Sequence, residues 1–173
     1  MALAVCLLFD PHSERAIRAL WERIEQQGVP SLRSHTHGRH VPHVSYAVLR
    51  RWDQAAVAEA LAADGGKPVQ LTFDGIGLFR RGRLWLVAGV SAEVVARQER
   101  VVDLITATGA ELHKYYRPGI WLPHCSLVPR ARLDQLPAVV AAVMDVLPLP
   151  AILDHAALIN SATAQISSLP VLP

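Results

Sequence analysis

The sequence predicts an α+β protein of two similar lobes, each a β-sheet with helices on one face. Hydrophobic residues make up 51% of the 173-residue chain and charged residues 18%, which suits one sizeable core and argues against disorder. Strand-like runs alternate with segments of helical periodicity along the whole chain. One pattern, apolar-Pro-His-x-Ser, occurs twice, at residues 41–45 and 122–126, with its histidines 81 positions apart.

The first half of the chain reads as strand, helix, strand, helix, strand. Continuous apolar runs predict buried strands, apolar residues at i, i+3, i+4 and i+7 predict helices, and strict alternation predicts a half-buried strand. We expect a buried strand over 2–9, a helix that Asp10 or Ser13 caps and Gly28 ends, a strand from the first pattern to about Leu49, a helix that Asp53 caps and residues 64–66 close, and a half-buried strand from Val69 to Phe79 that bends near Gly75.

The second half repeats this order after a hairpin. We expect a basic turn at 80–83, a strand over 84–90, a helix between Ser91 and Gly109, a polar loop at 113–119, a strand from the second pattern, a helix that Asp134 opens and Pro148 stops, a strand over 151–159, and an edge strand within 166–172. In the helix after Asp134, the inward side chains are predicted to be Leu136, Val140, Val143, Met144 and Leu147. Residues 1–173 are therefore predicted to form a single bilobal domain with pseudo-repeat halves at about 1–80 and 81–173.

Charge and cysteine usage narrow the class of protein. The formal net charge of +2 argues against bulk binding of long nucleic acid, but permits a small anionic substrate held by a few arginines. No apolar run reaches the ~18 residues of a membrane span, and the apolar residues 1–9 lack the basic flank and cleavage site of a signal peptide. Cys6 and Cys125 lie in apolar runs and read as reduced core thiols. We therefore expect a cytoplasmic protein with no membrane association and no obligate protein partner.

The predicted catalytic residues lie in the two copies of the repeated pattern. On a strand, residues i and i+2 point to the same face, so His43 with Ser45, and His124 with Ser126, each present an imidazole beside a hydroxyl. Because the imidazole pKa is normally about 6.5, two histidines in one cleft can act as base and acid on a phosphate ester. The serines can donate hydrogen bonds to the phosphoryl oxygens, and Arg130 can add positive charge. Neither a metal nor a cofactor is required by this scheme.

Two His-x-Ser motifs on strands about eighty residues apart resemble the 2H phosphoesterase superfamily, which includes 2′-5′ RNA ligase-like proteins and 2′,3′-cyclic nucleotide phosphodiesterases. Residues 79–86 resemble the family's segment between the halves, and Tyr116-Arg117-Pro118 resembles the lead into its second motif. The resemblance implies a bilobal fold of two pseudo-symmetric antiparallel-sheet lobes, with helices on the outer faces and a central cleft. This sequence departs from the family in carrying Ser where Thr is common, and in placing Arg130 one residue late, after a proline.

The resemblance implies a metal-independent enzyme acting on 2′,3′-cyclic phosphates or 2′-5′ phosphodiester linkages of RNA ends or nucleotides. Carried over, His43 and His124 form the catalytic pair, while Ser45 and Ser126 hold the phosphoryl oxygens. We favour His124 as the base that activates water and His43 as the acid, although the pseudo-symmetry allows the reverse.

Other residues have alternative interpretations. Histidines 35, 37, 40 and 43 suggest a metal site, but their spacing matches no zinc motif, and a solvated loop or a lid in which His37 or Arg39 meets substrate is favoured. Tyr116 is a candidate base-stacking residue, and Arg83 is a candidate phosphate contact within the basic turn. The competing function is a binding module that holds a nucleotide or an RNA end without turnover.

Overall fold

The computed structural model describes residues 2–63 and 65–173. Its strands and α-helices are β1 (Leu3–Phe9), α1 (Pro11–Gln26), β2 (His43–Arg51), α2 (Gln54–Ala62), β3 (Val69–Phe79), β4 (Arg83–Gly89), α3 (Ala92–Ala107), β5 (Glu111–Leu112), β6 (His124–Val128), α4 (Leu136–Val143), β7 (Leu149–Asn160) and β8 (Ile166–Ser168). Short 3₁₀ turns lie at Lys114–Tyr116, Leu133–Gln135 and Met144–Val146.

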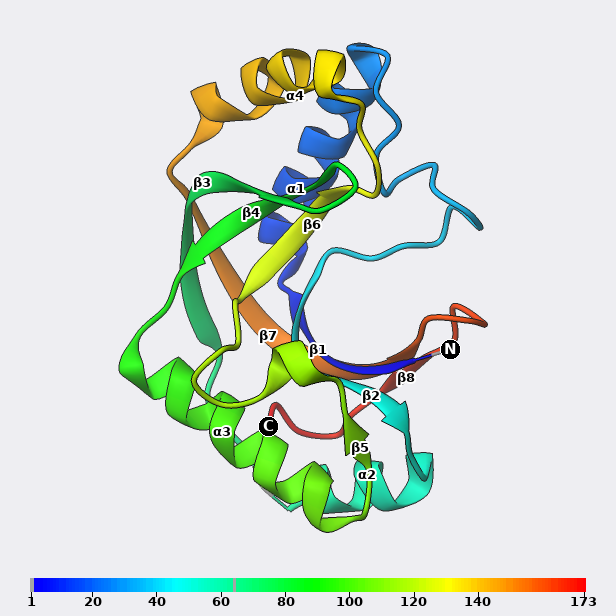
Figure 1. Ribbon diagram of the computed structural model, residues 1–173. Helices are drawn as coiled ribbons and strands as arrows, with labels where there is room; N and C mark the ends of the chain where they lie inside the picture. The colour runs from blue at the N-terminus through cyan, green and yellow to red at the C-terminus, as the bar shows by residue number, and fades with distance from the viewer. Residues whose placement is uncertain (1, 64) are drawn as a thin grey trace.

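All eight strands join one strongly curved antiparallel sheet, in the order β5-β2-β1-β7-β3-β4-β6 with β8 on β7 (Figure 1). The long strand β7 is the middle strand of this order and joins its two halves. Its first residues, from Leu149 to Leu153, pair with β3, and the stretch from Leu153 to Asn160 pairs with β1. The predicted α+β class with antiparallel sheets is confirmed. Strands from both halves of the sequence interleave in this order, and the internal duplication stays a prediction.

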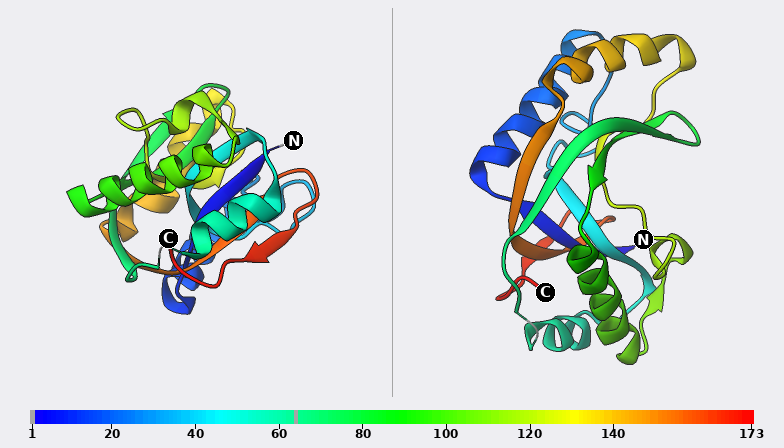
Figure 2. Two further views of the ribbon diagram at one scale, coloured as in Figure 1. Left: turned by 90° about the horizontal axis from the view of Figure 1, so that it is seen from below. Right: turned by 90° about the vertical axis from the view of Figure 1, so that its left-hand side faces the viewer.

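The helices form two pairs at opposite ends of the molecule (Figures 1 and 2). α1 packs on α4, and α2 packs on α3. Three of the four begin at the predicted caps, because the side chains of Asp10, Asp53 and Ser91 accept hydrogen bonds from backbone N–H groups of the first turn. The apolar faces of these helices and strands form one core, which includes the fully buried Trp21 and Tyr46.

The predicted inner face of α4 is correct for Val143, and Leu136 and Leu147 pack partly buried against the core, but it is wrong for Val140 and Met144. Val139, Ala142 and Val143 are buried, whereas Val140 and Met144 are 42% and 49% exposed. Because nearly every residue of this helix is apolar, its sequence carries no polar stripe that would indicate which face turns inward.

Helix α3 buries two polar side chains, Arg97 and Gln98. The Arg97 guanidinium donates hydrogen bonds to the carbonyls of Lys67, Leu172 and Pro173, and thereby joins α3 to the chain before β3 and to the end of the described chain. Such side chains are tolerated in a core because they are hydrogen-bonded there.

Two further expectations concern the cysteines and membrane spans. Cys6 and Cys125 are both buried and both free, as predicted. Among the described residues, no helix combines the length and apolar character needed to cross a bilayer.

Candidate active site

The two copies of the repeated pattern meet at the centre of the molecule. His43 is the first residue of β2 and His124 the first of β6, and these strands contact each other although they lie in opposite halves of the sheet order. In each copy the histidine and serine are half-buried and the residue between them is buried, so His and Ser share one face as predicted.

Tryptophans fix the backbone of both strands at this point. The Trp121 Nε1–H donates to the Ser45 carbonyl over 2.9 Å, and the Trp21 Nε1–H donates to the Ser126 carbonyl over 3.2 Å. Trp121 precedes β6 but bonds β2, and Trp21 belongs to α1 but bonds β6. Each serine backbone is therefore held by a part of the chain remote from its own strand.

Both imidazoles are oriented by the same main-chain bond. The Nδ1 atom of His43 lies 2.8 Å from the Val41 carbonyl oxygen, and that of His124 lies 2.7 Å from the Leu122 carbonyl oxygen. Since a carbonyl can only accept, Nδ1 carries the proton in both rings, and Nε2 is left free to accept a proton. Proline follows Val41 and Leu122 in both copies, and this favours an extended backbone at the residue whose carbonyl is used.

The two histidines share an environment that favours their neutral forms. Burial lowers the pKa of His43 below its ordinary value, the bond to Val41 opposes this shift, and the nearby His124 lowers it further. Burial likewise lowers the pKa of His124, against the bond to Leu122. Since both pKa values are lowered, the free protein favours two neutral imidazoles, and the effect of His124 on His43 disfavours charging both rings at once.

The hydroxyls of the pattern have different neighbours. Ser45 Oγ lies 3.6 Å from the buried Cys6 Sγ and interacts with the Tyr116 side chain. Burial raises the pKa of Cys6 and of Tyr116 to about 12, so both groups stay protonated at neutral pH. Ser126 instead lines a cavity of about 670 Å³.

A cavity of about 670 Å³ opens beside His124. Its lining also includes the predicted contacts Tyr116 and Arg83. The side chains of His43 and Ser45 are not part of this lining, and Ser45 is connected to it through Tyr116.

The cavity wall includes an aromatic pair that the sequence did not single out. Phe79 and Trp85 stack with ring centroids 4.7 Å apart, and the His124 ring lies edge-on to both, at 5.2 and 5.4 Å. The Trp85 indole covers Gly77, where an added Cβ would lie 2.1 Å from a ring carbon. Trp85 is buried in the sheet and also lines the cavity. The feature that places Trp85 in this wall is the strand register, because Trp85 pairs with both Gly77 and Ser126.

Gln98 was also missed, because a polar residue on a helix is normally expected at the surface. Its side-chain amide nitrogen donates to the Tyr46 carbonyl over 3.1 Å and to the Tyr116 carbonyl over 2.8 Å. Tyr46 directly follows Ser45 on β2. Gln98 therefore ties the aromatic loop that carries Tyr116 to the strand that carries His43.

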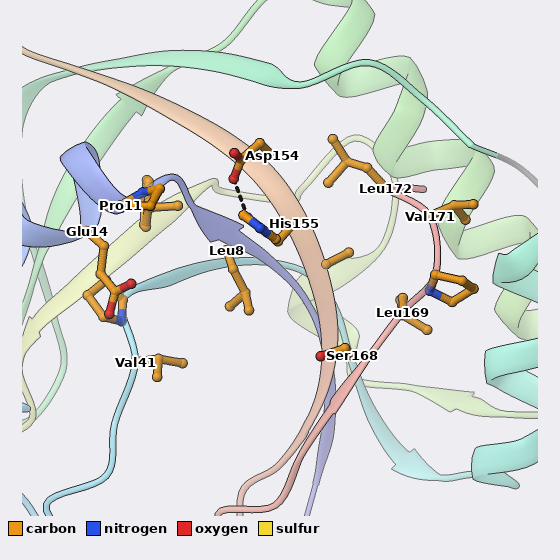
Figure 3. A pocket seen from close by; sticks show the side chains of 14 residues that line it. Leu8, Pro11, Glu14, Val41, Asp154, His155, Ser168, Leu169, Val171 and Leu172 are labelled. Carbon is orange, nitrogen blue, oxygen red and sulfur yellow. Dashed lines mark ion pairs between the residues drawn. The ribbon is translucent and has the colours of Figure 1, made fainter.

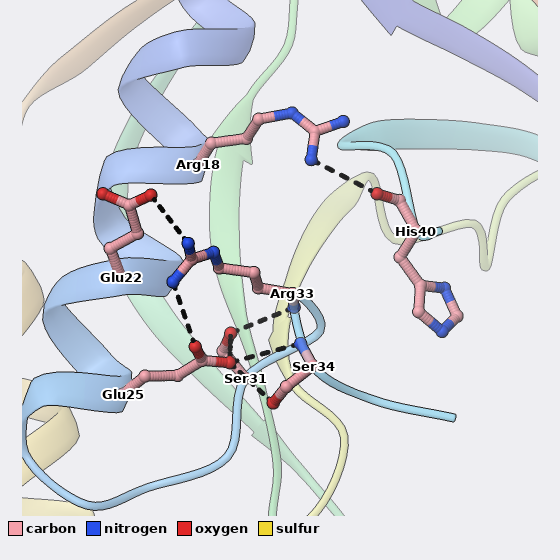
Figure 4. Close-up of polar contacts among 7 residues, drawn as sticks. All are labelled: Arg18, Glu22, Glu25, Ser31, Arg33, Ser34 and His40. Carbon is pink, nitrogen blue, oxygen red and sulfur yellow. Dashed lines mark hydrogen bonds and ion pairs between the residues drawn. The ribbon is translucent and has the colours of Figure 1, made fainter. Parts of the chain in front are cut away.

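The loop between α1 and β2 is anchored at its start by acidic residues of α1 (Figure 4). The Glu25 carboxylate accepts hydrogen bonds from Ser31 and Ser34, and Arg33 forms ion pairs with Glu22 and Glu25. The backbone of the same loop then donates from residue 32 to the Leu127 carbonyl over 3.0 Å. The beginning of the loop is thus held between α1 and β6.

The histidines of this loop form a stack. The rings of His37 and His40 lie 4.4 Å apart, and those of His35 and His40 lie 5.7 Å apart. Burial and the neighbouring histidines lower the pKa of His40 to about 4. His40 Nε2 lies 3.1 Å from Thr36 Oγ1, and His37 Nδ1 accepts from the Arg39 N–H over 3.0 Å. Among the described residues, no group of three or more His, Cys, Asp or Glu side chains that could hold a metal ion is found. His35 lines the cavity, whereas His37 and Arg39 are exposed and lie outside its lining.

Of the predicted basic contacts, some line the cavity and others do not. Arg80 and Arg83 belong to its lining. Arg130 is exposed and does not, although the adjacent Pro129 does.

A second cavity, of about 380 Å³, lies between the start of α1, β7 and the chain after β8 (Figure 3). Its lining includes Val41, Glu14 and an ion pair between Asp154 and His155. Neither His43 nor His124 lines it, and its walls are mostly apolar. Of the two cavities, the larger is the one that a histidine and a serine of the repeated pattern line, His124 and Ser126.

Comparisons with known proteins agree with the fold and identify the family. A family model described as the 2′-5′ RNA ligase superfamily matches residues 9–165. Kluyveromyces marxianus Usb1 with uridine monophosphate is similar in fold, with 15% identity, a TM-score of 0.56, and coverage of 98% of this chain and 97% of that chain. Escherichia coli LigT complexed with ATP is also similar, with 14% identity, a TM-score of 0.55, and coverage of 98% and 93%. Comparison with curated proteins gives no match.

The family match spans most of the chain, and the structural likeness spans nearly all of it. Together they agree with the antiparallel fold and with the resemblance carried by the repeated pattern. The chain belongs to the 2′-5′ RNA ligase superfamily, within the 2H phosphoesterases.

Proposed function

We propose that this protein is a metal-independent phosphoesterase that acts on 2′,3′-cyclic phosphates or 2′-5′ phosphodiester linkages of RNA ends or nucleotides. The observation that carries the proposal is the pair of imidazoles on contacting strands, each with Nδ1 bound to a carbonyl two residues earlier. This arrangement leaves two Nε2 atoms to exchange protons with a substrate. Membership of a phosphoesterase superfamily supports the same reaction class.

The proposed steps balance with water as the only co-reactant. His124 accepts a proton from water on Nε2 while the water oxygen forms a bond to phosphorus. The bond from phosphorus to one ribose oxygen breaks, and that oxygen takes the proton that His43 carries on Nε2. Ser45 and Ser126 donate hydrogen bonds to the non-bridging oxygens, where negative charge increases. The anionic substrate favours the protonated form of His43, which burial alone disfavours.

The test uses chelator-treated protein and the four nucleoside 2′,3′-cyclic monophosphates, with products separated by chromatography. We expect opening to a single phosphate isomer, and loss of turnover in His43→Gln and His124→Gln. His12→Gln changes an exposed histidine of α1 and serves as the matched control. Circular dichroism establishes that each variant is folded.

Full activity in either motif variant would contradict the two-histidine mechanism. If the cyclic nucleotide binds but is recovered unchanged, the protein is a binding module on the same fold. Loss of activity in chelator, regained on adding a metal, would contradict metal independence.

A further inference from the structure

The two serines of the repeated pattern have unequal surroundings. Ser126 lines the larger cavity together with His124. Ser45 does not line it, and its Oγ atom lies 3.6 Å from the buried Cys6 Sγ and interacts with the Tyr116 side chain. Tyr116 does line this cavity, so it connects the hydroxyl of the first copy to the space beside the second.

The backbone of Tyr116 is held from two sides. Its N–H donates to the His113 carbonyl over 2.9 Å, and its carbonyl accepts from the side-chain amide of Gln98 over 2.8 Å. The same amide donates to the carbonyl of Tyr46, which directly follows Ser45 on β2. One buried glutamine thus joins the strand that carries Ser45 to the 3₁₀ turn that carries Tyr116, and this turn contacts β2.

The protonation of these groups sets the direction of their hydrogen bonds. Burial raises the pKa of Tyr116 and of Cys6 to about 12, so each keeps its proton at neutral pH and can donate it. A serine hydroxyl has two acceptor lone pairs and one proton. When the Tyr116 hydroxyl and the Cys6 thiol both donate to Ser45 Oγ, its lone pairs are used and its own proton is left for a third group.

We propose that Tyr116 is a positioning residue whose hydroxyl donates to Ser45 Oγ and directs the Ser45 proton towards the reacting phosphoryl oxygen. The inference rests on the proposed function, in which Ser45 stabilises the charge that increases on that oxygen. A donor that is already oriented stabilises the transition state without reorganisation during the reaction. Loss of the Tyr116 hydroxyl should therefore lower kcat rather than weaken substrate binding.

The test compares two Tyr→Phe variants, each of which removes one phenolic oxygen. Tyr116→Phe retains the ring that lines the cavity and loses the hydroxyl. Tyr46→Phe is the matched control, because Tyr46 is fully buried and its hydroxyl has no hydrogen-bond partner among the described residues. On the nucleoside 2′,3′-cyclic monophosphates, we expect Tyr116→Phe to lower kcat about tenfold with KM changed by less than about twofold, as for one lost hydrogen bond in the transition state. Tyr46→Phe should retain the wild-type values.

A double-variant cycle separates positioning from packing. Ser45→Ala removes the hydroxyl that Tyr116 orients and should lower kcat about a hundredfold. In the Ser45→Ala background, Tyr116→Phe should cause no further loss, because no hydroxyl remains to be oriented. An equal loss in both backgrounds, an unchanged kcat in Tyr116→Phe alone, or a rise in KM alone would overturn the inference.

The contact between the two hydroxyls is also measured without any reaction. Calorimetry compares the Tm of the wild type, the two single variants and the double variant. Since Ser45→Ala and Tyr116→Phe remove the two partners of one interaction, their shifts in Tm should not add. If no cyclic phosphate is turned over by the wild type, the proposed function fails. Additive shifts would then overturn the inference as well, whereas non-additive shifts would uphold the positioning of Ser45 by Tyr116.

Discussion

Gly77 is the position where adding one methyl group is expected to disturb both the fold and the candidate site. An added Cβ would lie 2.1, 2.2 and 2.4 Å from three atoms of the Trp85 indole. That ring is rigid and only 6% exposed, and it is stacked on Phe79, so it cannot move aside without repacking the wall of the cavity. Because Trp85 also contacts His124, displacement of the indole reaches the imidazole.

The size of the effect follows from overpacking. Forcing an extra carbon into a packed site costs about 1–3 kcal/mol. We expect Gly77→Ala to lower the free energy of unfolding by about 2 kcal/mol, which in a protein of this size lowers Tm by about 4–8 °C. We also expect a fall in kcat/KM on a cyclic phosphate substrate.

Gly75→Ala is the matched control. Gly75 lies on the same strand and the same face, and its added Cβ would be 3.7 Å from the nearest atom of Val87, an ordinary contact. Both substitutions reduce the flexibility of the unfolded chain equally, so the difference between them isolates the clash with the indole. Calorimetry and urea titration measure it, and equal Tm values for the two variants would refute the reasoning.

Three further predictions follow from the same structure. Gln98→Leu removes the donor from two backbone carbonyls and should lower the free energy of unfolding by about 1–3 kcal/mol in urea titration. Gly82→Ala should destabilise more than Gly28→Ala: both glycines have positive φ, but only at Gly82 does a backbone carbonyl lie 1.9 Å from the added carbon. Because burial lowers the pKa of both His43 and His124 in the free protein, kcat/KM should rise by up to about tenfold as the pH falls from 7.5 to 6.5.

Each of these predictions has a clear contrary outcome. Gln27→Leu, at an exposed glutamine, is the control for Gln98, and equal stability of the two variants would exclude a structural role for the buried amide. Equal stability of the two glycine variants would mean that the loop after β6 moves freely off the hairpin turn. A flat pH profile between 6.5 and 8 would show that the essential acid has a pKa above that range.

The local elements were predictable because each carries its own signal. Proline before each histidine and apolar residues after it mark β2 and β6, and strand alternation correctly places histidine and serine on one face. The caps at Asp53 and Ser91 were likewise readable. These features depend on residues within one or two turns or strand repeats.

What could not be predicted depends on contacts between distant segments. The two-residue strand β5 exists because residues near Leu112 pair with the end of β2. The buried Gln98 donates to the carbonyls of Tyr46 and Tyr116, which lie far from it in the sequence, so no local pattern indicates that it is buried. The contact between Trp85 and His124 requires the register of three strands, which no local periodicity encodes.

The hydrogen bond that orients each imidazole is made to a backbone carbonyl, and this limits which mutations can remove it. Every amino acid supplies the same carbonyl, so no codon change at position 41 or 122 deletes the acceptor. In a Ser-His-Asp triad, by contrast, exchanging one carboxylate for an amide is enough to reverse the tautomer. Mutations that inactivate this acid–base pair must therefore replace a histidine or change the backbone conformation beside it.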